Sequence, residues 1–251
     1  MLLLSWVLAA DVIEEVENGH IDWTHSMLVV EATGGQNTGA WSDTKLVEQT
    51  AVSQLELRVR TTAMALPYDD ARRAEDLSET EGVGSALDEG LAGWEIAETR
   101  YYTSGKVQLR AEVDLQDWLR PALVAEAEGD PDGATQPTEI TGIVIDARGL
   151  DVRPTVAPKV LAPGTQELIY GGGFLTPEAA AASVPVIWVT DPADAEAIAR
   201  AGAQPAILDV QAVRGGSDLI LRADDASQLR AIGLNSDLLR TGRVVVIVDP
   251  R

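Results

Sequence analysis

The chain contains no cysteine among its 251 residues. This absence excludes disulfides, thiolate metal sites, a cysteine nucleophile and lipidation at a processed N-terminal cysteine. The two histidines, His20 and His25, have a spacing that matches no recognised zinc pattern. We therefore expect neither a metal site nor a cofactor.

Positive charge is scarce as well. Lys and Arg together number 19 and Asp and Glu number 40, so the formal net charge is 19 − 40 = −21. A surface of this sign repels polyanions, which argues against nucleic acid as a partner. Anionic lipid headgroups would be repelled for the same reason. The charge is typical of a well-solvated, soluble surface.

The N-terminal region lacks basic residues, because no Lys or Arg precedes Lys45. Residues 1–10 are nevertheless almost entirely apolar, and an acidic stretch begins at Asp11. This pattern fits a short apolar region followed by a cleavage site, so we predict a signal peptide at residues 1–10 and export of the protein. The alternative is a buried N-terminal strand or helix. The run is too short to cross a bilayer as a helix, and we expect no transmembrane segment.

Local markers of catalysis are missing. The chain has no Gly-x-Ser-x-Gly elbow, and the glycines at residues 171–173 are not followed by the Gly-Lys-Ser/Thr ending of a phosphate loop. Acidic pairs such as Asp69/Asp70 and Asp224/Asp225 are adjacent in sequence, which does not place two acids across one cleft. We predict that the protein is not an enzyme and has no catalytic residues.

The first half predicts an α+β domain at residues 18–124. A β-rich run at residues 27–32 precedes a helix that Ser42 or Asp43 can cap and that ends before Pro67. Apolar residues repeat every four positions along this helix, so one face should lie on a sheet: Val47, Ala51, Leu55, Val59 and Ala63. A short helix at residues 85–94 follows. Residues 95–102 and 106–113 then alternate around a Gly-containing turn, which predicts a hairpin with one buried face.

The second half predicts another domain at residues 139–251, after an acidic, Pro- and Gly-containing linker at residues 125–138. The chain as a whole is therefore predicted to be α+β, with two small mixed sheet-plus-helix domains. The elements expected in the second domain are strands near 140–147, 159–161, 168–170 and 184–189, a helix at 193–201 capped by Asp191, a hairpin of 207–214 and 218–223, a helix that starts from an Asp cap at 224–225, and a final strand at 243–249. The uninterrupted apolar final strand should be central and covered on both faces.

Residues 141–160 join an apolar strand to an Asp-Ala-Arg-Gly corner and a Pro-punctuated extended segment. Asp146 and Arg148 flank Ala147, so their opposite charges can pin the following turn, where Gly149 supplies permissive backbone geometry. We interpret the segment as a structural or interaction motif, which consists of Asp146, Arg148, Gly149, Arg153, Pro154 and Pro158. The alternative interpretation is that Arg148 binds an anionic group, either a carboxylate or a phosphate.

The motif at residues 141–160 resembles the corresponding run in bacterial envelope proteins of the flagellar assembly protein T and flagellar protein P type, a family of secreted proteins and lipoproteins. The opening at residues 18–24, the hairpin and the final run at residues 243–249 also resemble this family, so the resemblance extends from about Asn18 to the end. The first helix departs from the family's Ala/Arg-rich pattern because it carries Glu48 and several polar residues. The chain therefore resembles a distant member.

The resemblance implies a structural role in the envelope, such as support of rings or disks around a flagellar motor. It implies a location in the periplasm or at the outer membrane, without lipidation because cysteine is absent, and partners among envelope or flagellar basal-body proteins or further copies of the chain. The main alternative is a periplasmic module that binds a cell-wall or small anionic molecule through Arg148 and Arg153, in a cleft between the domains. A hydrolase with dispersed carboxylates is the third hypothesis.

Overall fold

The computed structural model describes residues 10–35, 44–133 and 139–250. The predicted signal peptide, apart from Ala10, and the predicted helix caps Ser42 and Asp43 lie outside the described residues. Two sheets with accompanying helices make up the structure, which confirms the α+β class with two sheet-plus-helix units. Among the helices formed by the described residues, none combines the length and the apolar character that a bilayer span requires.

The first sheet is antiparallel and five-stranded, in the order β1-β2-β3-β5-β4. Its long central strands pair along their whole length, from Met27 opposite Asp114 to Gly34 opposite Val107. The strands are β1 (Ile13–Val16), β2 (Gly19–Asp22), β3 (Met27–Gly34), β4 (Glu95–Tyr101) and β5 (Val107–Asp114). The β1–β2 hairpin was not predicted, since its strands are only four residues long and half of their residues are polar.

Helix α1 (Thr44–Met64) covers one face of this sheet, over β3 and β5. The buried residues of α1 are the predicted period-four stripe: Val47, Ala51, Leu55, Val59 and Ala63. Full burial of a Val or Leu side chain contributes roughly 1.5–3 kcal/mol, so the stripe accounts for the docking of the helix. The prediction for this helix is confirmed.

Three shorter helices follow α1 in the first half. They are α2 (Ala74–Leu77), α3 (Val83–Ala92) and α4 (Leu115–Glu126). Helix α4 starts directly after β5, because the Asp114 side chain accepts a hydrogen bond from the Asp117 amide and caps the first turn. This helix was not predicted, and it extends into the first two residues of the predicted linker. The segment that follows α4 is bound to the second half, since the Glu128 amide donates to Gly173 O over 3.0 Å and the Gly129 amide to Leu175 O over 2.8 Å.

The second sheet is mixed and seven-stranded, in the order β8-β7-β11-β10-β6-β12-β9. Strands β10, β6, β12 and β9 run parallel to one another, whereas β11 is antiparallel to β10. The strands are β6 (Ile143–Asp146), β7 (Val160–Leu161), β8 (Leu168–Tyr170), β9 (Ile187–Val189), β10 (Ala206–Arg214), β11 (Asp218–Leu221) and β12 (Val244–Ile247). All four residues of β12 are buried between β6 and β9, which confirms the prediction of a central final strand.

Parallel strands need crossover connections, and helices supply several of them here. The second half contains a 3-10 turn η1 (Gly172–Phe174) and helices α5 (Pro177–Ala182), α6 (Ala195–Ala201) and α7 (Ala223–Asn235). The cap of α6 is Asp194 and not the predicted Asp191, because Asp194 accepts the bond from the Glu196 amide. Helix α7 starts after Arg222, so the predicted cap residues Asp224 and Asp225 occupy its first turn.

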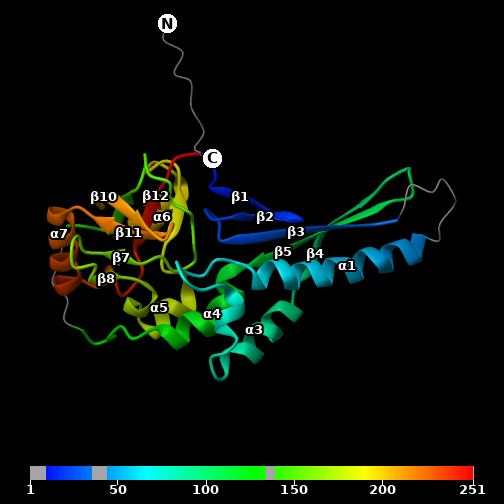
Figure 1. The fold of residues 1–251 in the computed structure, drawn as a ribbon, viewed down its shortest axis with the longest axis horizontal. Coiled ribbons are helices and arrows are strands. Elements are labelled where there is room, and N and C mark those ends of the chain that lie inside the picture. The colour runs from blue at the N-terminus through cyan, green and yellow to red at the C-terminus, as the bar shows by residue number, and fades with distance from the viewer. Residues whose placement is uncertain (1–9, 36–43, 134–138, 251) are drawn as a thin grey trace, which may run out of the picture.

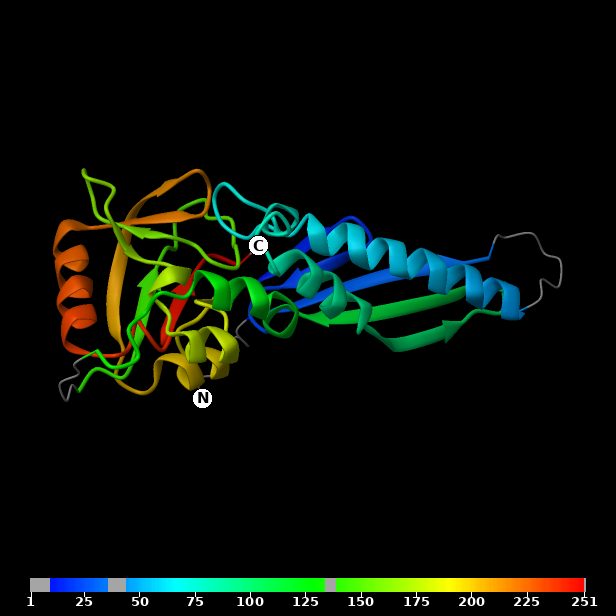
Figure 2. The ribbon, with the colours of Figure 1, turned by 90° about the horizontal axis from the view of Figure 1, so that it is seen from below.

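The molecule is elongated, and the two sheets lie at different ends of it. Figures 1 and 2 show that α1 and strands β3, β4 and β5 form an arm that extends away from the second sheet. Strand β4 lies at the free edge of this arm and is exposed on both faces, whereas the sequence predicted one buried face for the whole hairpin. The reason is that α1 covers β3 and β5 and does not reach across to β4.

Candidate functional site

A loop of the first half docks onto the second half and forms the centre of a polar junction. This junction loop, residues 66–73, connects α1 to α2. Its carbonyl oxygens at Pro67 and Tyr68 accept hydrogen bonds from the amides of Val156 and Ala157, over 3.3 and 2.8 Å. The loop closes on itself because the Tyr68 amide donates to Arg72 O over 2.9 Å. The two halves are therefore joined through backbone as well as side-chain contacts.

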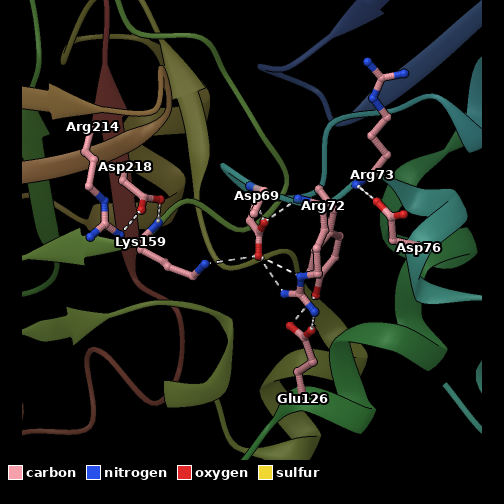
Figure 3. A network of polar contacts seen from close by, with 10 residues as sticks. Asp69, Arg72, Arg73, Asp76, Glu126, Lys159, Arg214 and Asp218 are labelled. Carbon is pink, nitrogen blue, oxygen red and sulfur yellow. Dashed lines mark hydrogen bonds and ion pairs between the residues drawn. The ribbon is translucent and has the colours of Figure 1, made fainter. Parts of the chain in front are cut away.

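Asp69 is the buried anion of the junction, with a side chain that is 1% exposed. Its Oδ1 accepts from the amides of Ala71 and Arg72 over 2.9 and 2.8 Å, which fixes the carboxylate within the loop. Its Oδ2 accepts from the Arg72 guanidinium, at 2.7 Å from one terminal nitrogen, and from Lys159 Nζ at 3.3 Å (Figure 3). Lys159 belongs to the second half, so this carboxylate bridges the two parts of the chain.

Arg72 reaches a second carboxylate at the end of α4. Its guanidinium lies 2.5 Å from Glu126 Oε1, and the Tyr68 hydroxyl donates to Glu126 Oε2 over 2.8 Å. The same guanidinium lies over the Tyr68 ring, 5.1 Å from the ring centre, where a cation is attracted to the aromatic face. We call the set Tyr68, Asp69, Arg72, Glu126 and Lys159 the junction network.

A second buried carboxylate lies beside the junction network. Asp218 at the start of β11 is fully buried and pairs with the Arg214 guanidinium at 2.6 Å. The backbone amide of Lys159 donates to Asp218 Oδ1 over 3.4 Å, while its ammonium group points to Asp69 (Figure 3). Lys159 therefore links two buried anions. Because an unpaired buried charge is costly, each of these groups holds its partner in place.

The pKa values within the junction network favour fixed charges. Burial alone would raise the pKa of Asp69, but hydrogen bonds from Arg72 and from the Ala71 amide outweigh it and the pKa lies below its usual value. Burial and the neighbouring Glu126 raise the pKa of Tyr68. Burial opposes the charge of Arg72, yet Glu126 and Asp69 raise its pKa overall. These groups keep one protonation state around neutral pH, so the network is suited to positioning and not to proton transfer.

The predicted motif residues lie elsewhere. Asp146 ends β6, and its carboxylate accepts from the Arg148 amide over 3.1 Å and from Arg148 Nε over 2.9 Å. The hydrogen bond from Arg148 lowers the pKa of Asp146. Gly149 has a φ of +78°, and its amide donates to Asp249 Oδ2 over 2.7 Å. These hydrogen bonds hold the turn after β6 in place, and the Arg148 guanidinium is already bound to Asp146.

Arg153, Pro154 and Pro158 follow this turn toward the junction. The Arg153 amide donates to Gly216 O over 2.7 Å, and its guanidinium lies 3.4 Å from Glu14 Oε1 of β1. Pro154 and Pro158 are buried. Arg153 lines a cavity of about 370 Å³ whose other charged residues are Glu14, Glu17 and Arg58. Arg148 does not line this cavity, so the cavity does not form the predicted anion-binding site that uses both Arg148 and Arg153.

Sequence reasoning missed the junction network. Its members are separated by up to 91 positions, the distance in sequence from Tyr68 to Lys159. The available signal was the charge-rich stretch that starts at Asp69, two residues after Pro67. Charge of this kind in a loop is usually solvated, and only the fold shows that Asp69 is buried.

One histidine lies among carboxylates near the start of the chain. His25 Nδ1 is 2.8 Å from Asp22 Oδ2, and candidate ligand atoms of Asp11, Asp22 and His25 lie within 4.8 Å of one another. The hydrogen bond with Asp22 raises the pKa of His25. Asp22 Oδ1 also accepts from the amides of Thr24 and His25, so local hydrogen bonds account for the positions of Asp22 and His25.

The comparison with known protein families gives a match for the second half of the chain. Residues 142–250 match the family model described as the second domain of Treponema pallidum Tp0624. The matched range contains every strand of the second sheet, from β6 to β12, and leaves the first sheet outside. The second half is therefore similar to a domain of a bacterial protein. No curated protein matches the chain. Nothing in the matching description refers to a flagellum, so the flagellar resemblance stays a prediction.

Proposed function

We propose that the protein is a non-enzymatic, exported structural or assembly component of the bacterial envelope that acts through protein–protein contacts. The junction network is the observation that carries the proposal. Its charged groups join the arm to the second sheet, and each buried carboxylate in it has cationic partners. A chain built in this way presents two surfaces at a fixed relative orientation, which is a property that assembly components need.

The arm supports the same proposal. Strands β3 and β5 are eight residues long, and α1 has 21 residues along them. Most of the arm's outer residues are polar or charged, but Leu46 and Leu57 on α1 and Tyr101 on β4 are each more than 60% exposed. These exposed apolar side chains are available for contact with another protein.

The location and the partners belong to the proposal too. The apolar N-terminal run supports export to the periplasm or to the outer membrane. The resemblance of residues 141–160 to flagellar assembly protein T and flagellar protein P supports envelope or basal-body proteins as partners. The match of residues 142–250 to a bacterial domain is compatible with both.

Fractionation and native purification test this function. Cells that carry a C-terminally tagged copy would be separated into cytosol, periplasm and membranes, and the protein would be purified with its bound partners. We expect an envelope fraction and co-purifying envelope proteins. An Arg72→Met variant, in which the junction network is broken, should retain export but lose partners. A protein confined to the cytosol, with no stable partner, would contradict the proposal.

A further inference from the structure

Strand β4 is an unpaired edge at the side of the arm. Among the residues that the structure describes it pairs with β5 alone, and six of its seven residues are exposed. Strand β5 beside it alternates between buried and more exposed residues, as expected where α1 covers one face. The edge carries apolar side chains, since Ile96 is 42% and Tyr101 61% exposed. Natural sheets protect such edges or use them to pair with another strand.

We propose that β4 pairs with β4 of a second copy of the chain, antiparallel and about a two-fold axis at Thr99. This inference rests on the proposed contact function and names one partner for it. The edge-to-edge contact joins two five-stranded sheets into one continuous sheet. A two-fold contact of this kind is isologous, so each residue pairs with its symmetry counterpart and the assembly closes as a dimer.

The sequence of β4 is self-complementary in this register. With Thr99 opposite Thr99, Glu98 of each copy lies opposite Arg100 of the other. Directly opposed residues of opposite charge stabilise antiparallel pairs. Within one copy Glu98 and Arg100 already form an ion pair on an exposed face, with Glu98 Oε1 2.6 Å from Arg100 Nε. In the dimer each group would exchange this partner for the same group of the other copy.

Neighbouring registers are unfavourable. In an antiparallel pair, directly opposite residues point to the same face of the sheet. The two-fold axis of a symmetric β4–β4 pair must therefore pass through a residue, and the nearest alternative registers place the axis one residue away from Thr99. A centre at Glu98 places two carboxylates opposite each other, and a centre at Arg100 places two guanidinium groups opposite each other. Like charges in direct opposition are destabilising. The β-bulge between Ile96 and Glu98 limits the regular pairing at the other end.

The overall charge sets the conditions under which the dimer forms. Each copy carries a formal charge of −21, so two copies repel at low ionic strength. At about 0.15 M salt the Debye length is about 8 Å, and repulsion between distant parts of the two surfaces is screened. The contact should therefore be measured at this ionic strength or above.

Charge exchange at the edge tests the register. Sedimentation of the purified protein over about a hundredfold range of concentration should show a monomer–dimer equilibrium. Glu98→Arg or Arg100→Glu alone should weaken the dimer at least about tenfold, because each places like charges in opposition. The double variant Glu98→Arg/Arg100→Glu should restore it, and a mixture of the two single variants should form the heterodimer. Asp88→Arg, which changes the net charge as Glu98→Arg does, should leave the equilibrium unchanged.

A cysteine placed at the axis gives an independent test. Because the chain has no cysteine, Thr99→Cys introduces a single thiol that would face its counterpart in the second copy. Opposed Cβ atoms lie about 4.5–5.5 Å apart in antiparallel pairs, within reach of a short thiol cross-linker. Thr99→Cys should give a covalent dimer much faster than Ser104→Cys in the adjacent turn. Equal cross-linking of the two variants, or a wild-type protein that stays monomeric, would overturn the inference. If such a monomer still purified with envelope proteins, the proposed function would stand without this contact.

Discussion

Lys159 Nζ lies 3.3 Å from Asp69 Oδ2, an ion pair between residues 90 positions apart that joins the two halves of the chain. The Asp69 side chain is only 1% exposed, so its charge depends on this ammonium group and on Arg72. The orientation of the arm relative to the second sheet therefore depends on the side chains of Asp69, Arg72 and Lys159. Their replacement gives direct measurements of how firmly the two sheets are joined.

Arg72→Met should destabilise the protein by about 3 kcal/mol, since it leaves two carboxylates, Asp69 and Glu126, without their main cation. The estimate lies at the low end for a buried pair because the Arg72 side chain is 40% exposed. Arg60→Met is the control, because Arg60 and Asp88 form an exposed pair that should contribute less than about 1 kcal/mol. Urea unfolding measures both. Equal losses for the two variants would contradict the role given to the junction network.

Asp69 should make stability depend on acidity. Burial disfavours its charge, but the hydrogen bonds from Arg72 and the loop amides lower its pKa in the folded state. The stabilisation is therefore fully present above the unfolded-state pKa near 3.8 and is lost as the pH falls through the lower folded-state pKa. We expect the difference in unfolding free energy between wild type and Asp69→Asn to shrink from about pH 6 to about pH 3. A difference that stays constant over this interval would rule out the explanation.

His25 should titrate above the usual histidine range. Its hydrogen bond with Asp22 raises the pKa from 6.5, so the contribution to stability is present below pH 6.5 and is lost as the pH rises through the folded-state pKa. The effect on stability should be small because the side chain is 49% exposed. An NMR titration of the His25 ring would show the raised pKa directly. It should fall toward 6.5 in Asp22→Asn, and an unchanged titration curve would show that Asp22 is not the cause.

Gly129→Ala should be destabilising by about 2 kcal/mol, although the sequence places Gly129 in a linker. A Cβ atom at Gly129 would lie 2.4 Å from Phe174 O and 2.6 Å from Leu175 O, which are backbone atoms that cannot move aside cheaply. Gly93→Ala is the matched control, because the nearest atom there is Gly90 O at 3.5 Å. Thermal unfolding of both variants decides the matter. Tolerance of Gly129→Ala would mean that residues 127–129 are not held against η1.

Local patterns were sufficient for the parts of the fold that local interactions determine. The stripe from Val47 to Ala63 predicted both the helix and its buried face, and the apolar run at residues 243–249 predicted a central strand. The turn at Gly149 could also be anticipated, because Asp146 and Arg148 are only two positions apart. These features depend on neighbours in the sequence, whose chemistry is visible without the fold.

The junction network and the exposure of β4 depend on contacts between distant segments. Whether Asp69 is solvated or buried is decided by the docking of residues 156–157 on the junction loop, which no local pattern encodes. Strand β4 is exposed because α1 covers β3 and β5 and does not extend across the sheet to β4. Helix α4 was missed because its Pro121 and charged residues obscure the apolar spacing of Leu115, Trp118, Leu119, Ala122 and Leu123.

The direct passage from β5 into α4 has a mechanical consequence. Strand β5 ends at Asp114, α4 begins at Leu115, and the last residue of α4, Glu126, holds Arg72 of the junction. A pull on the outer end of the arm along its length would load the full-length β3–β5 ladder in shear, so its hydrogen bonds would share the force instead of opening one after another. The arm would then transmit the pulling force to the second sheet with little extension.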